Sequence, residues 1–148
     1  MKAFSNLLSD LILTSSRNRK LSLLEQYFSS TPDPDRGYAL AALTGSLNFK
    51  NIKASFFKDL IKEKQDEHLF DLSYDYVGDL AETISLLWDQ EKSGNMPRLS
   101  SLFENLKKAK TDELKNYIIN ILNISTADQR WAFIKPVSYT HLRAHETD

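Results

Sequence analysis

The sequence has no cysteine, and its 148 residues include four glycines and four prolines. Without cysteine the chain forms neither disulfides nor thiolate metal sites, and no redox role can be read from it. This composition is compatible with a reducing cytoplasm, which is where we expect the protein. Such low numbers of glycine and proline argue against a turn-rich all-β fold and favour helices.

An excess of charge of one sign is also missing. Lysine and arginine number 19 and aspartate and glutamate 20, which gives a formal net charge of −1. Any contact with nucleic acid must therefore rest on local basic patches. No apolar run approaches the length of a membrane span. Polar residues interrupt the apolar N-terminal segment 1–13, so it has the pattern of an amphipathic helix and not of a signal peptide. We expect no membrane partner.

Apolar residues recur at helical spacing along most of the chain. The pattern predicts an all-α fold of about eight or nine short helices in one compact domain. The first helices are expected at residues 4–12, 21–28, 38–43, 49–64 and 66–72. Asn18 or Ser16 is expected to cap the second helix, and the third is expected to close near Gly45. After a loop at 89–97, further helices are expected to begin near Leu99, near Thr111 or Asp112, and at Thr126.

The most marked pattern lies at residues 72–88, which read as one helix. Ser73 or Asp75 is placed to cap it. One apolar stripe follows, made of Val77, Leu80, Ala81, Ile84, Leu87 and Trp88. Gly78 falls in an early turn, where glycine costs about 1 kcal/mol relative to alanine. We therefore expect another helix or a phosphate to approach the backbone closely at Gly78.

Residues 73–88, S-Y-D-Y-V-G-D-L-A-E-T-I-S-L-L-W, resemble a signature of the N-terminal DNA-binding domain of bacterial ATP-dependent DNA ligases. Blocks at 14–21, 31–45 and 130–135 resemble the same family, and together they cover residues 1–135 in order. The resemblance implies a compact, multi-helix DNA-ligase-type domain that is monomeric and binds nicked double-stranded DNA. It also implies that the full-length enzyme uses ATP and a divalent metal, usually Mg²⁺.

The end of the chain departs from the family, which continues at this point with apolar and glycine-rich sequence. Residues 137–147 instead match one reading frame of a transposon-end adapter used in sequencing libraries. We therefore predict a helical DNA-binding domain at 1–135 and a non-native tail at 136–148.

The catalytic K-x-D-G motif of the ligase family is absent from the sequence. Residues 64–67 and 110–113 begin like it, but each has glutamate in place of glycine. We therefore expect no catalytic residue and no cofactor in this chain, which should not ligate alone. Four acidic residues recur on one face of the helix predicted around 72–88. Without a partner histidine or a second acidic helix, we interpret Asp71, Asp75, Asp79 and Glu82 as favourable helix-start charges and predict no metal site.

The resemblance implies a grip on the minor groove of nicked duplex, mostly through phosphate and sugar. Such contacts use small polar residues, backbone amides at helix starts, and lysine or arginine. The candidates for DNA binding are Ser16, Arg17, Asn18, Lys20, Gly45, Lys50, Lys53 and Gly78. The alternative is a helical protein-interaction module with no nucleic-acid role, in which these residues merely cap and solvate helices. The near-neutral charge mildly favours that alternative.

Overall fold

The computed structural model describes residues 1–49, 52–92 and 94–138. Within them the fold is all-α, with nine helices and no strand, as the sequence predicts. The helices are α1 (Lys2–Leu13), α2 (Arg17–Ser30), α3 (Asp35–Thr44), α4 (Ala54–Lys64), α5 (Glu67–Val77), α6 (Leu80–Leu87), α7 (Leu99–Lys108), α8 (Thr111–Ile124) and α9 (Ala127–Ser138).

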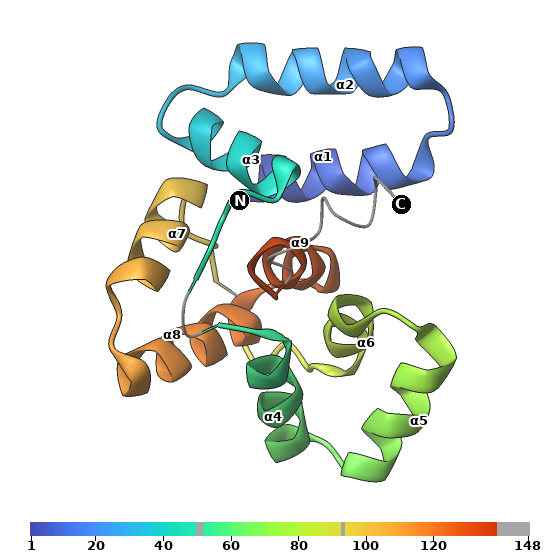
Figure 1. Ribbon diagram of the computed structural model, residues 1–148, viewed down its shortest axis with the longest axis vertical. Coiled ribbons are helices and arrows are strands. Elements are labelled where there is room, and N and C mark those ends of the chain that lie inside the picture. The colour runs from blue at the N-terminus through green and yellow to red at the C-terminus, as the bar shows by residue number, and fades with distance from the viewer. Residues whose placement is uncertain (50–51, 93, 139–148) are drawn as a thin grey trace.

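Helix α9 lies at the centre of the molecule. Figure 1 shows it nearly end-on, with α1 on one side and α6 on the other, and α1, α3 and α6 all pack against it. Ala132, Phe133 and Ile134 of α9 are completely buried. The ring of Phe133 meets that of Phe57 from α4 edge to face, with the centroids 6.4 Å apart. This arrangement favours aromatic pairs beyond the burial of their area.

Side-chain caps fix the starts of several helices. Ser16 Oγ accepts a hydrogen bond from the amide of Arg19 at 3.3 Å, which begins α2. Thr126 and Gln129 bond reciprocally, side chain to amide, at the start of α9. This is a capping box, in which two amides without helical partners are satisfied together. The predicted caps Ser16 and Thr126 are confirmed.

The prediction of one helix over residues 72–88 is wrong, because two helices meet there. Gly78 ends α5 with a left-handed φ of 83°, and its amide donates to the carbonyl of Tyr74 at 2.8 Å. Asp79 then caps α6 by accepting from the amide of Glu82 at 2.9 Å. The helix predicted at 66–72 is the first part of α5, which Asp66 caps in place of Ser73 or Asp75.

The predicted close approach of another helix to Gly78 is also wrong. A Cβ added at this position would meet nothing within 4 Å, so no neighbouring helix requires a glycine there. Glycine is favoured because its φ is positive, a conformation that costs other residues about 1–2 kcal/mol.

The helix predicted at 49–64 begins later than expected, at Ala54. Phe49 and Ile52 are nevertheless buried, so apolar spacing here reflects the core and not a helix. Gly45 does close α3, with a left-handed φ of 75°. Residues 136–138 of the predicted tail continue α9 and are buried. In the described part of the chain, no helix combines the length and the apolar character that a membrane crossing needs.

Candidate nucleic-acid interface

The first turn of α2 gathers the strongest local positive charge among the candidates. Arg17, Arg19 and Lys20, which we call the basic turn, are all exposed. Within the described residues none of the three makes an ion pair. Arg19 was not among the predicted site residues, although its place between Asn18 and Lys20 was the signal that could have identified it. Ser16 and Asn18 lie in the same exposed turn.

The basic turn opposes the field of its own helix. A helix N-terminus carries a partial positive charge, so that anions are favourable there and cations are not. No acidic residue lies in the first turn of α2 to offset the three cations. The first amides of a helix also lack partners within the helix. Here Ser16 Oγ accepts a hydrogen bond from one of them, the amide of Arg19. Positive charges and amide donors at one exposed site suit an anion.

The remaining candidates lie elsewhere. In Figure 1 the start of α2, the end of α3, the start of α4 and the α5–α6 junction occupy separate places. Gly45 and Gly78 end helices, and both amides donate to carbonyls of the helix that they close. Helix C-termini carry partial negative charge, which disfavours phosphate. Lys53 precedes α4 and is exposed. Lys50 lies outside the described residues.

Several lysines of α4 belong to the fold. Lys62 and Lys64 lie over the rings of Phe70 and Trp88, with the ammonium 6.0 and 5.3 Å from the respective ring centroid. The same two lysines form ion pairs with Glu67 and Glu91, at 3.4 and 3.7 Å. Cation–π contacts and surface pairs of this kind are worth up to about 1 kcal/mol each. Lys62 and Lys64 are therefore held by contacts within the fold.

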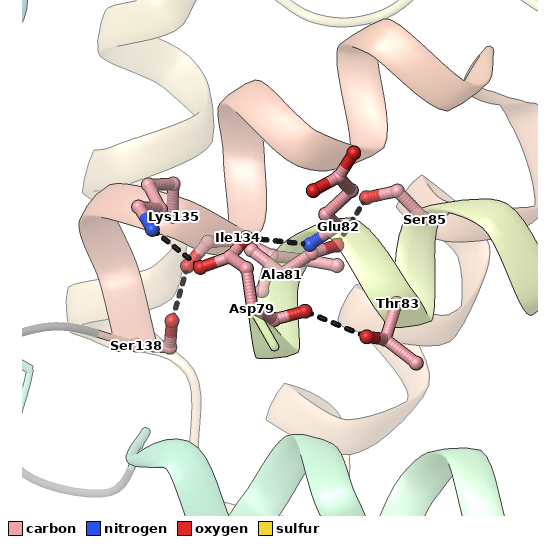
Figure 2. Close-up of polar contacts among 8 residues, drawn as sticks. All are labelled: Asp79, Ala81, Glu82, Thr83, Ser85, Ile134, Lys135 and Ser138. Carbon is pink, nitrogen blue, oxygen red and sulfur yellow. Dashed lines mark hydrogen bonds and ion pairs between the residues drawn. The ribbon is translucent and has the colours of Figure 1, made fainter. Parts of the chain in front are cut away.

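Two of the sequence blocks that resemble the ligase family meet in space. Asp79, at the start of α6, pairs through Oδ1 with the Lys135 ammonium of α9. Its other oxygen, Oδ2, caps α6, and its carbonyl accepts from Thr83 Oγ1 at 2.7 Å. Figure 2 shows Asp79 between the two helices, with Lys135 directed toward it. This carboxylate sets the position of α6 against α9.

Arg130, from the same block as Lys135, is buried and joins three helices. Its Nε and Nη2 donate to the carbonyl of Ser85 in α6, at 3.1 and 3.0 Å, and Nη1 donates to the carbonyl of Ser125 at the end of α8. Burial lowers the pKa of Arg130, while the charge of Asp89 acts in the opposite direction. The guanidinium satisfies carbonyls at two helix C-termini, where positive charge is favourable.

The two stretches that begin like the catalytic motif are helix starts. Asp66 caps α5 through a hydrogen bond from the Leu69 amide, at 3.0 Å, and Lys110 immediately precedes α8. Among residues 1–49, 52–92 and 94–138, no three histidine or acidic side chains are grouped to hold a metal ion. Asp71 and Asp75 lie on α5, while Asp79 and Glu82 belong to the start of α6, so the predicted single acidic face is divided.

Comparisons of this chain with protein-family profiles, with curated proteins and with solved structures find no match. The resemblance to ATP-dependent DNA ligases therefore stays a prediction from the sequence.

Proposed function

We propose that this chain is the DNA-binding portion of an ATP-dependent DNA ligase. It holds nicked duplex DNA through backbone contacts, so that the catalytic domains of the full-length enzyme can seal the nick. The observation that supports this proposal is the basic turn of α2, three exposed cations without ion-pair partners among the described residues. A phosphate bound there would offset the unfavourable charges and accept from the free amides at once.

Phosphate contacts position a protein on DNA without reading its sequence. A site of cations and backbone amides suits contacts of this kind. The turn between α1 and α2 also lies at the periphery of the molecule (Figure 1). In this proposal the protein acts as a cytoplasmic monomer, and ATP and Mg²⁺ belong to the full-length enzyme.

The test is the salt dependence of binding to a nicked duplex, measured by fluorescence anisotropy. The logarithm of the association constant should fall with the logarithm of salt concentration with a slope of about −0.9 for each phosphate neutralised. Three contacts at the basic turn would give a slope near −2.7. Binding that is independent of salt, or absent at low salt, contradicts the proposal and favours the helical protein-interaction module.

Arg17→Ala localises the interaction. The variant should weaken binding equally for unrelated DNA sequences and make the slope shallower by about 0.9. Because the change removes an unfavourable charge from a helix start, loss of fold is not expected to explain a loss of affinity. Lys108→Ala is the matched control, since Lys108 is an exposed cation at the far end of α7. If the Arg17 variant binds as tightly as the Lys108 variant, the basic turn is not the interface.

A further inference from the structure

A groove lies between α1 and α6 and above α9. It has a volume of about 540 Å³. Ile12 and Leu13 of α1 form one wall, Leu86 of α6 contributes to the other, and Trp131 of α9 lies between them. Figure 1 shows α1 and α6 on opposite sides of α9.

The walls of the groove expose more apolar surface than the fold requires. Leu13 is 84% exposed, and Ile12 and Leu86 are each 64% exposed. Helix α1 packs through Phe4, Leu7 and Leu11, whereas Ile12 and Leu13 at its end remain exposed. Single exposed leucines are common on protein surfaces, whereas several that converge on one groove mark an interaction site.

The apolar surface continues beyond the groove. Leu86 also lines a second hollow of about 320 Å³, together with Leu72 and Tyr76 of α5. Leu72 is 56% and Tyr76 93% exposed. An elongated apolar track of this kind suits the apolar face of a helix, which presents anchors at successive turns.

The charges in the groove are mainly negative. Asp79, Glu82 and Asp128 line it together with one cation, Lys135, which gives a net charge of −2. Lys135 is paired with Asp79, whereas in the described part of the chain neither Glu82 nor Asp128 has an ion-pair partner. This field repels phosphate and attracts lysine or arginine. Nucleic acid therefore does not suit the groove, and a basic polypeptide does.

We propose that the groove between α1, α6 and α9 binds a basic amphipathic helix of a partner protein. The apolar face of that helix covers Leu13, Ile12 and Leu86, and its lysines or arginines lie against Glu82 and Asp128. The inference does not depend on DNA binding, because no residue of the basic turn lines the groove and the net charge of the groove has the opposite sign.

The probe is a fluorescein-labelled amphipathic helix of about 18 residues, roughly five turns, with leucine on one face and lysine on the other. Its counterpart keeps the leucines and replaces every lysine with glutamate. Anisotropy titrations with the full chain should show binding of the lysine peptide, and binding at least about tenfold weaker for the glutamate peptide.

Two variants with matched controls locate the binding. Leu86→Asp should weaken binding of the lysine peptide about tenfold or more, because an apolar anchor is lost. Leu40→Asp, at a leucine of α3 that is 53% exposed, should have no effect. Glu82→Lys should weaken binding about fivefold. Glu113→Lys should not, although Glu113 occupies the first turn of α8 as Glu82 does that of α6.

Circular dichroism of each variant verifies that it is folded. The proposal is overturned if both peptides bind equally, or if Leu86→Asp and Leu40→Asp bind alike. It is also overturned if the chain dimerises in sedimentation experiments and Leu86→Asp abolishes the dimer, since a second copy is then the occupant. Arg17→Ala should not weaken peptide binding, because it removes a cation that a basic peptide does not contact, so failure of this inference and failure of the DNA proposal are distinguishable.

Discussion

At the scale of single residues, Arg130 shows how a buried charge is accommodated. It is 5% exposed and donates to carbonyls at the ends of α6 and α8. Carbonyls at helix ends lack partners within the helix, and a buried carbonyl without a donor costs about 1–3 kcal/mol. One guanidinium, with donors in a fixed fork, satisfies two such ends at once.

We expect Arg130→Met to lower the free energy of unfolding by roughly 2–4 kcal/mol, because it leaves the carbonyls of Ser85 and Ser125 buried without donors. Urea unfolding measures the loss. Arg36→Met is the control, since Arg36 donates its Nε to the carbonyl of Thr31 at 2.9 Å in an exposed position. Its cost should stay within about 0.5 kcal/mol. If both variants lower the free energy of unfolding equally, burial does not explain how much the hydrogen bonds of Arg130 contribute to stability.

The sequence predicts residue roles well where they are local. The cap at Ser16 was identified because its acceptor and donor are three positions apart. The role of Arg130 was not identified, because the carbonyl of Ser85 lies 45 positions earlier in the chain. The same applies to the groove, whose walls come from α1 and α6.

At the scale of helices, the junction of α5 and α6 depends on two adjacent residues. Apolar periodicity continues across residues 72–88 because Val77 at the end of α5 is half-buried and α6 buries Leu80, Ala81 and Ile84, so the stripe alone cannot distinguish one helix from two. Gly78 and Asp79 supply the missing information: glycine favours the end of a helix and aspartate the start of the next. Gly78 followed by Asp79 therefore predicts a junction between two helices more strongly than the apolar stripe predicts a single helix.

Two glycine variants should change stability in opposite directions. Gly78→Ala should destabilise the protein by about 1–2 kcal/mol, because φ at this position is positive. Gly37→Ala should stabilise it by about 0.5–1 kcal/mol, because Gly37 lies within α3 and an added Cβ meets nothing within 4 Å. Thermal unfolding of both variants provides the comparison. A neutral Gly78→Ala would mean that the junction adopts another conformation.

At the scale of the whole molecule, Asp35 connects distant parts of the chain and makes stability depend on pH. Its Oδ1 accepts from the amide of Ser100 at 2.9 Å, which supplies α7 with a cap from α3, and Oδ2 lies 3.6 Å from Arg98 Nε. Burial alone would raise the pKa of Asp35. The bonds from Ser100 and the charges of Arg98 and the N-terminal amine outweigh it, so the pKa is lowered.

A lowered pKa stabilises the fold above the ordinary value of about 4, and this contribution is lost as pH falls through the folded-state pKa. At pH near 7, Asp35→Asn should therefore lower the free energy of unfolding by about 1 kcal/mol, because the hydrogen bond from Ser100 then has a neutral acceptor and the attraction to Arg98 is lost. The difference from the unmodified protein should shrink as pH falls below about 4. Asp10→Asn, at an exposed acid of α1, is the control for general charge effects. A difference that does not change with pH would contradict this account.

The fold class was predictable because composition and periodicity are properties of the whole chain. The arrangement of the helices in space was not predictable. Nothing in the spacing of residues 127–138 indicates that α9 is the helix on which α1, α3 and α6 pack. That position follows from contacts between segments far apart in sequence, such as the one between Phe57 and Phe133.

The central place of α9 has a consequence for how the protein is made. Translation proceeds from the N-terminus, so α1, α3 and α6 leave the ribosome before the helix on which they pack. Until α9 follows, apolar residues such as Phe4 and Phe57 lack their final neighbours and are free to associate with other chains. The nascent chain therefore exposes these apolar residues until Phe133 has emerged and α9 completes the core.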